Sequence, residues 1–135
     1  MKFKAVLLGA SLLAICTVII LGCSKTDFSG KYKGKITVQE TGRAIEDVDF
    51  MLNQKGNEIA GSMTITQFPG DGQFKLTGSV DKEKIVFNSE SKDGFYLNFT
   101  GKGNNKNING DAELTYSGPR IGVKHDKATI ELIKQ

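Results

Sequence analysis

The sequence has no tryptophan, only two prolines and only one histidine, His125, among its 135 residues. A single histidine excludes metal sites built from several imidazoles and mechanisms that need two of them, so we interpret it as a surface residue. Beyond residue 22 no apolar row has the spacing of an amphipathic helix, which excludes a helical bundle. The asparagine-rich run 104–111 lacks the closing glutamate of a calcium loop. We expect no metal, no cofactor and no enzymatic activity.

The first 22 residues have the composition of a processing signal and are left out of the fold. Lys2 and Lys4 form a positive start, and the uncharged run 5–21 is slightly shorter than the ~20 residues of a spanning helix. The run ends in Ile20-Leu21-Gly22-Cys23, which resembles the lipobox of bacterial lipoproteins: an aliphatic residue stands three before the cysteine and a small one directly before it. An uncleaved anchor helix is the alternative.

We predict that residues 1–22 are removed, that lipid on Cys23 holds the chain to a membrane of the cell envelope, and that residues 23–28 form a tether before one β-domain at 29–135. The domain then has no disulfide, since acylation uses its one cysteine. Ser24 is not the aspartate associated with inner-membrane retention in enteric bacteria, which favours an outer membrane where the cell has one. The remaining charge is nearly balanced and forms no basic stripe, which excludes nucleic-acid binding.

Alternation of apolar and polar residues runs through the β-domain and predicts strands of an antiparallel sheet with one wet face. On the wet face, lysines 31, 33 and 35 of the first segment can lie beside Asp47 and Asp49 of the second. The apolar rows are Tyr32 to Val38, Val48 to Leu52, Ile59 to Ile65, Phe74 to Val80, Ile85 to Phe87, Phe95 to Gly101, Ile108 to Tyr116 and Ala128 to Leu132.

The connections between these rows are too short for crossover helices, so neighbouring rows should pair as hairpins. Eight such strands can curl until the last meets the first, which removes the exposed edges. We predict an all-β domain, an eight-stranded antiparallel up-and-down β-barrel. A two-sheet β-sandwich is the alternative.

Several short runs resemble small bacterial lipoproteins of unassigned role whose domains are calycin-like barrels, the group of lipocalins, fatty-acid-binding proteins and avidins. The runs are Gly30-x-Tyr32-x-Gly34, 52–62, 76–80, 108–111 and 130–132, and they cover the whole domain. The resemblance implies the barrel fold. Lipocalins and avidins place a tryptophan in the first strand, where this chain has Tyr32, and both arginines here fall in loops. No ligand specificity is therefore carried over, and a biotin site of the avidin kind is not expected.

The strand order divides the connections between two ends. The turns at 53–57, 81–83 and 102–107 lie at the end of the N-terminus, and the connections at 40–45, 66–73, 89–94 and 117–126 lie at the membrane-distal end. The longest connections, 66–73 and 117–126, are distal, which is where we expect function.

The inward rows also differ between the ends, because their glycines fall toward the N-terminal end and Phe74, Phe95 and Tyr116 toward the distal one. Inward glycines permit the strong coiling of a closing barrel, and the alternative is that they leave a cavity. The expected interior holds no charged residue, so an internal ligand should be apolar.

Two functions of different classes remain open: a binding barrel that takes a small apolar ligand through the distal mouth, and a module that binds an envelope protein or inhibits an enzyme. Lysozyme inhibitors with a Ser-Gly-x-x-Tyr motif motivate the second, although Ser29-Gly30-Lys31-Tyr32 is one residue short of that spacing. Phe68, beside Pro69, either caps the barrel or meets a partner. The candidate binding residues are Tyr32, Phe68, Phe74, Phe95, Tyr116 and Arg120.

Replacing the lipobox cysteine tests the anchor. We expect Cys23→Ser to abolish incorporation of labelled palmitate and to leave uncleaved precursor, because the thiol is the acylated group. Labelling that continues undiminished in this variant would contradict the prediction.

Overall fold

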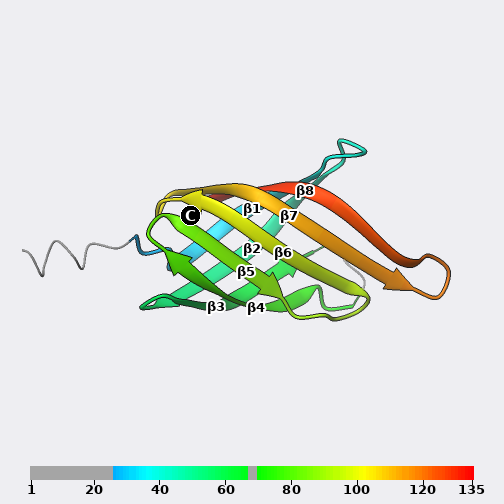
Figure 1. Cartoon of the computed structure of the whole chain (residues 1–135), viewed down its shortest axis with the longest axis horizontal. Helices are drawn as coiled ribbons and strands as arrows, with labels where there is room; N and C mark the ends of the chain where they lie inside the picture. Colours follow the sequence, from blue (N-terminus) through cyan, green and yellow to red (C-terminus); the bar gives the residue numbers. More distant parts are fainter. Residues whose placement is uncertain (1–25, 67–69) are drawn as a thin grey trace, which may run out of the picture.

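The computed structural model describes residues 26–66 and 70–135, and eight β-strands account for most of them (Figure 1). No helix in these two ranges is long and apolar enough to cross a membrane. The strands are β1 (Gly30–Val38), β2 (Ala44–Lys55), β3 (Glu58–Ile65), β4 (Gln73–Asp81), β5 (Lys84–Ser89), β6 (Phe95–Gly103), β7 (Asn107–Gly118) and β8 (Gly122–Lys134).

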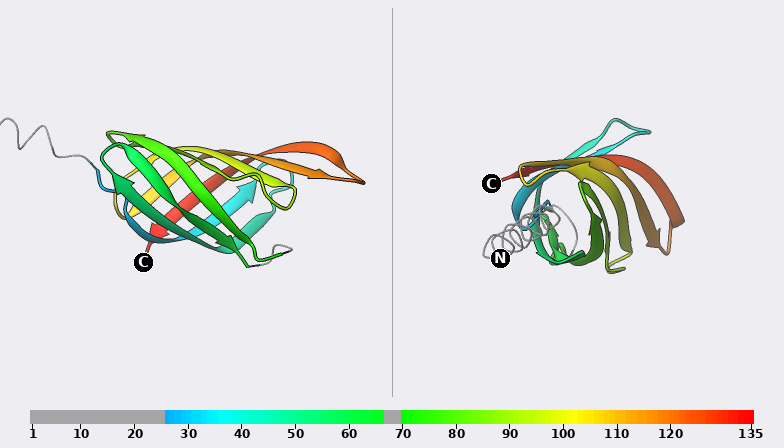
Figure 2. Two further views of the ribbon diagram at one scale, coloured as in Figure 1. Left: turned by 90° about the horizontal axis from the view of Figure 1, so that it is seen from below. Right: turned by 60° about the vertical axis from the view of Figure 1, so that its left-hand side comes forward.

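Each strand pairs antiparallel with its neighbours in sequence, and β1 pairs with β8 to close the barrel. The closing register runs from Tyr32 opposite Lys134 to Val38 opposite Ala128. Figure 2 shows the strands wrapping around one axis, tilted against it. The predicted up-and-down barrel is confirmed, and the two-sheet sandwich is excluded.

The two ends of the barrel differ in shape. The base carries the β2–β3, β4–β5 and β6–β7 turns and the starts and ends of the described chain, and the mouth carries the other connections (Figure 1). The connection predicted at residues 117–126 is wrong, because β7 continues to Gly118 and β8 starts at Gly122. These residues form a long hairpin that projects beyond the mouth, with Tyr116 paired opposite Lys124.

A bulge in β2 changes the ion pairs expected on the wet face. Asp47 has a positive φ of 58°, and the β1–β2 register shifts between Gly34 and Ile36. A bulge inserts one extra residue and re-aims its neighbours. Lys33 therefore reaches Asp49 at 2.6 Å, as expected, but Lys35 faces Glu46 at 3.7 Å instead of Asp47.

Phe28 closes the base and extends the folded domain by one residue into the expected tether. Its side chain is fully buried, and its carbonyl accepts a hydrogen bond from the Tyr32 hydroxyl at 2.8 Å. Gln54 holds the same segment, because its side-chain oxygen accepts from the Phe28 N–H and its own N–H donates to the Ser29 hydroxyl. Desolvation of the phenol raises the pKa of Tyr32 to about 12. Burial and these hydrogen bonds thus fix Phe28 in the base at the point where the chain enters the barrel.

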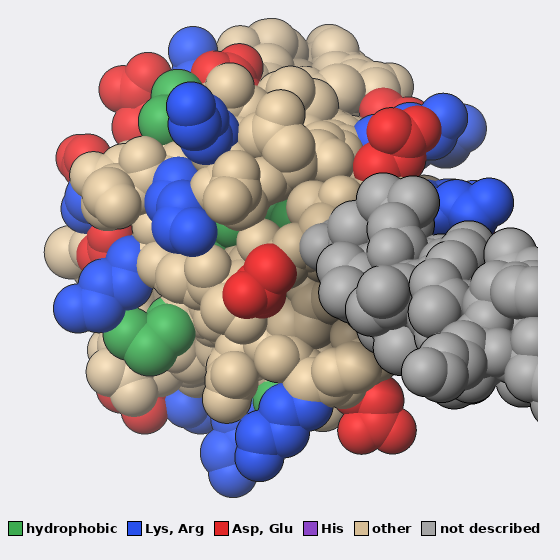
Figure 3. Space-filling view, turned by 90° about the vertical axis from the view of Figure 1, so that its left-hand side faces the viewer, with side chains coloured by type: hydrophobic (Ala, Val, Ile, Leu, Met, Phe, Trp, Pro, Cys, Tyr) green, Lys and Arg blue, Asp and Glu red, His purple; other side chains and the backbone are tan. Residues whose placement is uncertain are grey.

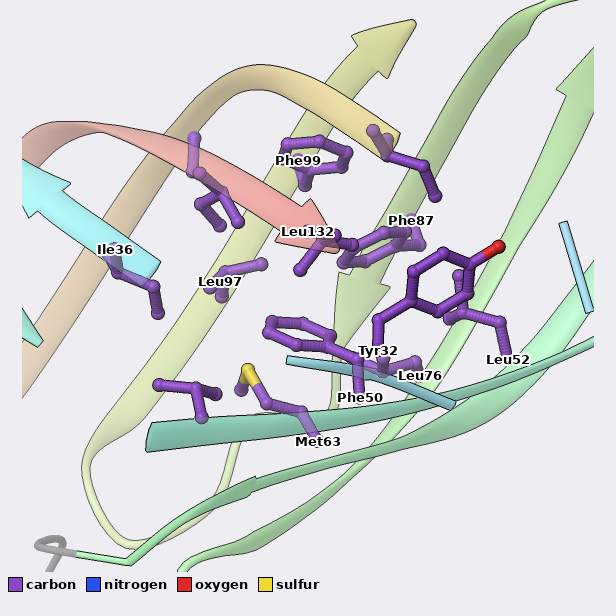
Figure 4. Packing of buried hydrophobic residues seen from close by; sticks show 14 of the residues in the cluster. Tyr32, Ile36, Phe50, Leu52, Met63, Leu76, Phe87, Leu97, Phe99 and Leu132 are labelled. Atoms are coloured by element: carbon purple, nitrogen blue, oxygen red, sulfur yellow. The ribbon is translucent and has the colours of Figure 1, made fainter. Parts of the chain in front are cut away.

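Phenylalanine rings fill the space over the inward glycines. A side-chain carbon on Gly34 would lie 2.5 Å from the Phe50 ring, and one on Gly110 would lie 2.9 Å from the Phe99 ring. The Phe87 ring links the two, with centroids 6.0 Å from Phe50 and 4.7 Å from Phe99 (Figure 4). The glycines therefore make room for rings, which favours the interpretation that they permit close packing over the alternative of a cavity.

Gly78→Val tests the close packing of the base. A side-chain carbon there would lie 2.7 Å from the backbone of Phe87, so overpacking should lower the free energy of unfolding by about 1–3 kcal/mol. Denaturant titration measures this. The neighbouring Thr77→Val, on the exposed face, is the control and should change little. Equal stability of the two variants would show that the glycine is not in a tight contact.

Candidate functional site

A pocket of about 530 Å³ opens at the mouth, between the β1–β2 hairpin and the projecting β7–β8 hairpin. Its size lies within the range of small-ligand sites, roughly 300–1,000 Å³. One part of its lining is apolar and the rest polar or charged. The lining residues are Val38, Thr41, Arg43, Ala44, Ile45, Ile65, Tyr116, Ile121, Lys124 and Asp126.

Asp126 is the unusual member of this lining. It lies opposite Leu114 in the β7–β8 register, two residues before the inward Ala128, so strand alternation turns its side chain inward. Only 9% of the residue is exposed, and its buried Oδ1 atom has no hydrogen-bond partner within residues 26–66 and 70–135. Lys124 Nζ lies 3.8 Å from the other oxygen, Oδ2. A buried carboxylate oxygen without a donor is costly, so it needs an explanation beyond stability.

Tyr116 stands beside this carboxylate and shares its surroundings. Burial raises the pKa of the Tyr116 phenol, the negative charge of Asp126 raises it further, and the positive charge of Arg43 opposes both. The phenol is therefore a neutral hydrogen-bonding group at physiological pH. It offers one donor and acceptor next to the acceptor-only Asp126.

Two cations border the pocket, and both are exposed. Arg43 comes from the turn that ends at β2, and Lys124 from the start of β8. Val38, Ile45 and Ile65 supply apolar surface from β1, β2 and β3. The pocket can therefore hold an apolar body, donate to an anionic group at its rim, and accept a hydrogen bond at Asp126.

The structure brings three of the expected site residues together. The Phe95 ring lies 5.2 Å from the Phe74 ring and 5.6 Å from the Tyr116 ring, centroid to centroid. Phe74 and Phe95 are buried and belong to the core, where Lys92 Nζ lies 5.7 Å over the Phe74 ring. Of the expected residues that the structure describes, only Tyr116 lines the pocket.

The other three expected residues lie elsewhere. Tyr32 is at the base, where its hydroxyl is used by Phe28. Arg120 is exposed in the turn between β7 and β8. Phe68 falls outside the described residues.

The expectation of an interior without charge is wrong, because Asp126 points into the mouth. The sequence predicts a loop at residues 117–126 because charged residues there interrupt the apolar row. The alternation nevertheless continues, since Lys124 and Asp126 have the same parity as Ala128, Ile130 and Leu132. The sequence could not predict that Arg43 lines the pocket, because residues in turns do not follow the apolar–polar alternation of strands. Among the described residues no group of three or more histidine, cysteine, aspartate or glutamate side chains could hold a metal ion.

The barrel is similar to solved avidin-type structures. It matches the bradavidin2–biotin complex with a TM-score of 0.59 at 12% identity, over 79% of this chain and 97% of that one. It matches apo shwanavidin in one crystal form with a TM-score of 0.52 at 12% identity, over 80% and 98% of the two chains. No protein-family model and no curated protein matches the sequence. At these identities the likeness shows the fold, an eight-stranded avidin-like barrel.

Asp126→Asn should stabilise the protein. The substitution keeps the shape of the side chain but removes the desolvated charge, so the free energy of unfolding should rise by about 1 kcal/mol. The control is Asp111→Asn, on the exposed wall of β7, which should be neutral. Thermal melts of both variants decide the matter, and a clear loss of stability in Asp126→Asn would mean that the carboxylate has a structural partner.

Proposed function

We propose that this chain is a lipid-anchored, non-enzymatic binding protein that takes a small ligand into the pocket at the mouth of its barrel. The observation that carries the proposal is the buried Oδ1 atom of Asp126, which lines the pocket and has no donor among the described residues. A ligand that donates a hydrogen bond there would supply what the fold lacks. Sites that hold polar groups for a ligand commonly give up stability to do so.

The pocket chemistry defines the ligand more closely than the sequence did. An apolar body suits Val38, Ile45 and Ile65, and an N–H or O–H group suits Asp126. A purely apolar ligand would leave the carboxylate desolvated and unpaired, which is costly. We therefore propose an amphipathic ligand in place of the apolar one.

The avidin-like neighbours support a small-ligand function in a coarse way. Bradavidin2, whose barrel is similar, was solved in complex with biotin. The present chain has no tryptophan, so biotin serves as a probe for the site and is not our proposed ligand.

The proposed anchor and the pocket belong to opposite ends of the barrel. The described chain begins at the base, three residues after Cys23 (Figure 1). The residues that line the pocket are at the opposite end of the barrel. Lipid on Cys23 would hold the base toward a membrane of the cell envelope and leave the mouth open to the surrounding compartment. An outer membrane remains the proposed location where the cell has one.

One observation favours the second candidate, an envelope protein-interaction or inhibitor module. Ile121 and Val123, at the tip of the projecting hairpin, are 61% and 67% exposed. Exposed apolar side chains beside Arg120 are typical of a protein contact. Substitutions at this tip would then weaken the interaction, whereas substitutions deep in the pocket would not.

Native mass spectrometry of the mature protein purified from its own cells tests the first function. We expect a bound small molecule, and we expect Asp126→Asn to weaken its binding about tenfold, because the amide oxygen accepts a neutral hydrogen bond in place of a charge-assisted one. Asp111→Asn is the matched control and should retain the ligand. Added biotin then reports whether the pocket accepts that compound. A protein that carries no ligand, or a ligand that both variants retain equally, would contradict the proposal.

A further inference from the structure

Five exposed lysines gather at the base of the barrel. They come from the β2–β3, β4–β5 and β6–β7 hairpins, which all turn at this end. We call them the turn lysines: Lys55, Lys82, Lys84, Lys102 and Lys106. They outnumber the acidic residues of the same turns, which are Glu58, Asp81 and Glu83. Figure 3 looks onto this end and shows basic side chains projecting around its periphery between scattered acidic ones.

The turn lysines form no ion pairs within the described residues, a property that they share with wall lysines such as Lys75 and Lys127. Elsewhere four lysines form ion pairs with acidic residues of the wall or the mouth: Lys33, Lys35, Lys92 and Lys124. No turn lysine lies within ion-pair distance of an acidic side chain in residues 26–66 and 70–135. Their charge is therefore available to something outside the barrel.

The mouth has the opposite balance of charge. Acidic residues are more numerous there than basic ones. The acidic residues are Glu40, Glu46, Asp47, Asp71, Glu90, Asp93 and Asp126, and the basic residues are Arg43, Lys92, Arg120 and Lys124. The charge of the domain is thus separated along the barrel axis, positive at the base and negative at the mouth, and an anionic plane would attract one end and repel the other.

We propose that the base is a membrane-docking surface, on which the turn lysines bind the anionic headgroups of the lipid layer that holds the anchor. The inference rests on the proposed lipidation of Cys23. The described chain starts at this same end, so a lipid on Cys23 would keep the turn lysines within a few residues of the bilayer surface. Because Phe28 is fixed in the base, only residues 24–27 separate the lipid-bearing cysteine from the barrel. Docking holds the barrel upright and the mouth away from the membrane.

A lipid anchor alone would let the barrel tilt and lie on its wall. Each lysine near an anionic surface strengthens binding about 5-fold, and the effect decays within a Debye length of about 8 Å at physiological salt. The upright orientation should therefore require anionic lipid and weaken with salt.

Energy transfer from the mouth to the membrane measures the orientation. The full chain, processed and lipidated in cells, carries Pro119→Cys in the exposed β7–β8 turn as its only free thiol and receives a donor fluorophore. It is inserted into phosphatidylcholine vesicles with or without phosphatidylglycerol, both carrying a headgroup acceptor. We expect lower transfer on the anionic vesicles, because the mouth stands away from them, and added salt should remove the difference.

Paired variants assign the effect. Lys102→Gln with Lys106→Gln should raise transfer on anionic vesicles toward the phosphatidylcholine value, whereas Lys75→Gln with Lys127→Gln, which removes two exposed wall lysines, should not. Equal transfer on both vesicle types, or equal effects of the two pairs, would overturn the proposal. Failure of the anchor would appear separately, as protein that does not float with phosphatidylcholine vesicles. In that case, flotation with anionic vesicles that salt abolishes would still support docking through the turn lysines. A protein that floats with neither kind of vesicle would overturn the docking proposal as well.

Discussion

The packing of phenylalanine rings over inward glycines is the constraint on which the rest of the structure depends. Phe50 covers Gly34 and Phe99 covers Gly110, and the Phe87 ring lies between them (Figure 4). An eight-stranded barrel is just wide enough to be filled by side chains, and here the base is filled. Rings over glycines permit the close approach and coiling that bring β1 to β8. The base is filled, and the mouth has a pocket of ligand size.

The mouth, unlike the base, contains a buried polar atom without a hydrogen-bond partner among the described residues. At the base, the buried Tyr32 hydroxyl donates to the Phe28 carbonyl. The buried Ser89 hydroxyl, at the end of β5 nearer the mouth, also has a partner, because it accepts from the Leu97 N–H. At the mouth, Asp126 leaves a buried oxygen without a donor in the described chain. Violations of this kind are expected at functional sites, because a group held ready for a ligand is unsatisfied until the ligand arrives.

The sequence predicted the barrel well because its apolar residues alternate strictly wherever a strand has one wet face, as in Phe95, Leu97 and Phe99. It predicted the site poorly for three physical reasons. Asp126 continues the apolar row of β8 with a charged residue, so the sequence predicts a loop at this position. The bulge at Asp47 depends on backbone conformation, which periodicity does not report. The position of Phe28 depends on a hydrogen bond to Gln54, which is 26 residues away in the sequence.

The central claim is that the carboxylate of Asp126 and the phenol of Tyr116 lie together in the pocket at the mouth. The pKa of Tyr116, followed by NMR in the ligand-free protein, tests it most directly. The structure predicts a pKa raised above the usual value, a lower but still raised pKa in Asp126→Asn because burial is the larger cause, and a further rise in Arg43→Gln. An ordinary pKa for Tyr116, or one that Asp126→Asn leaves unchanged, would contradict the account.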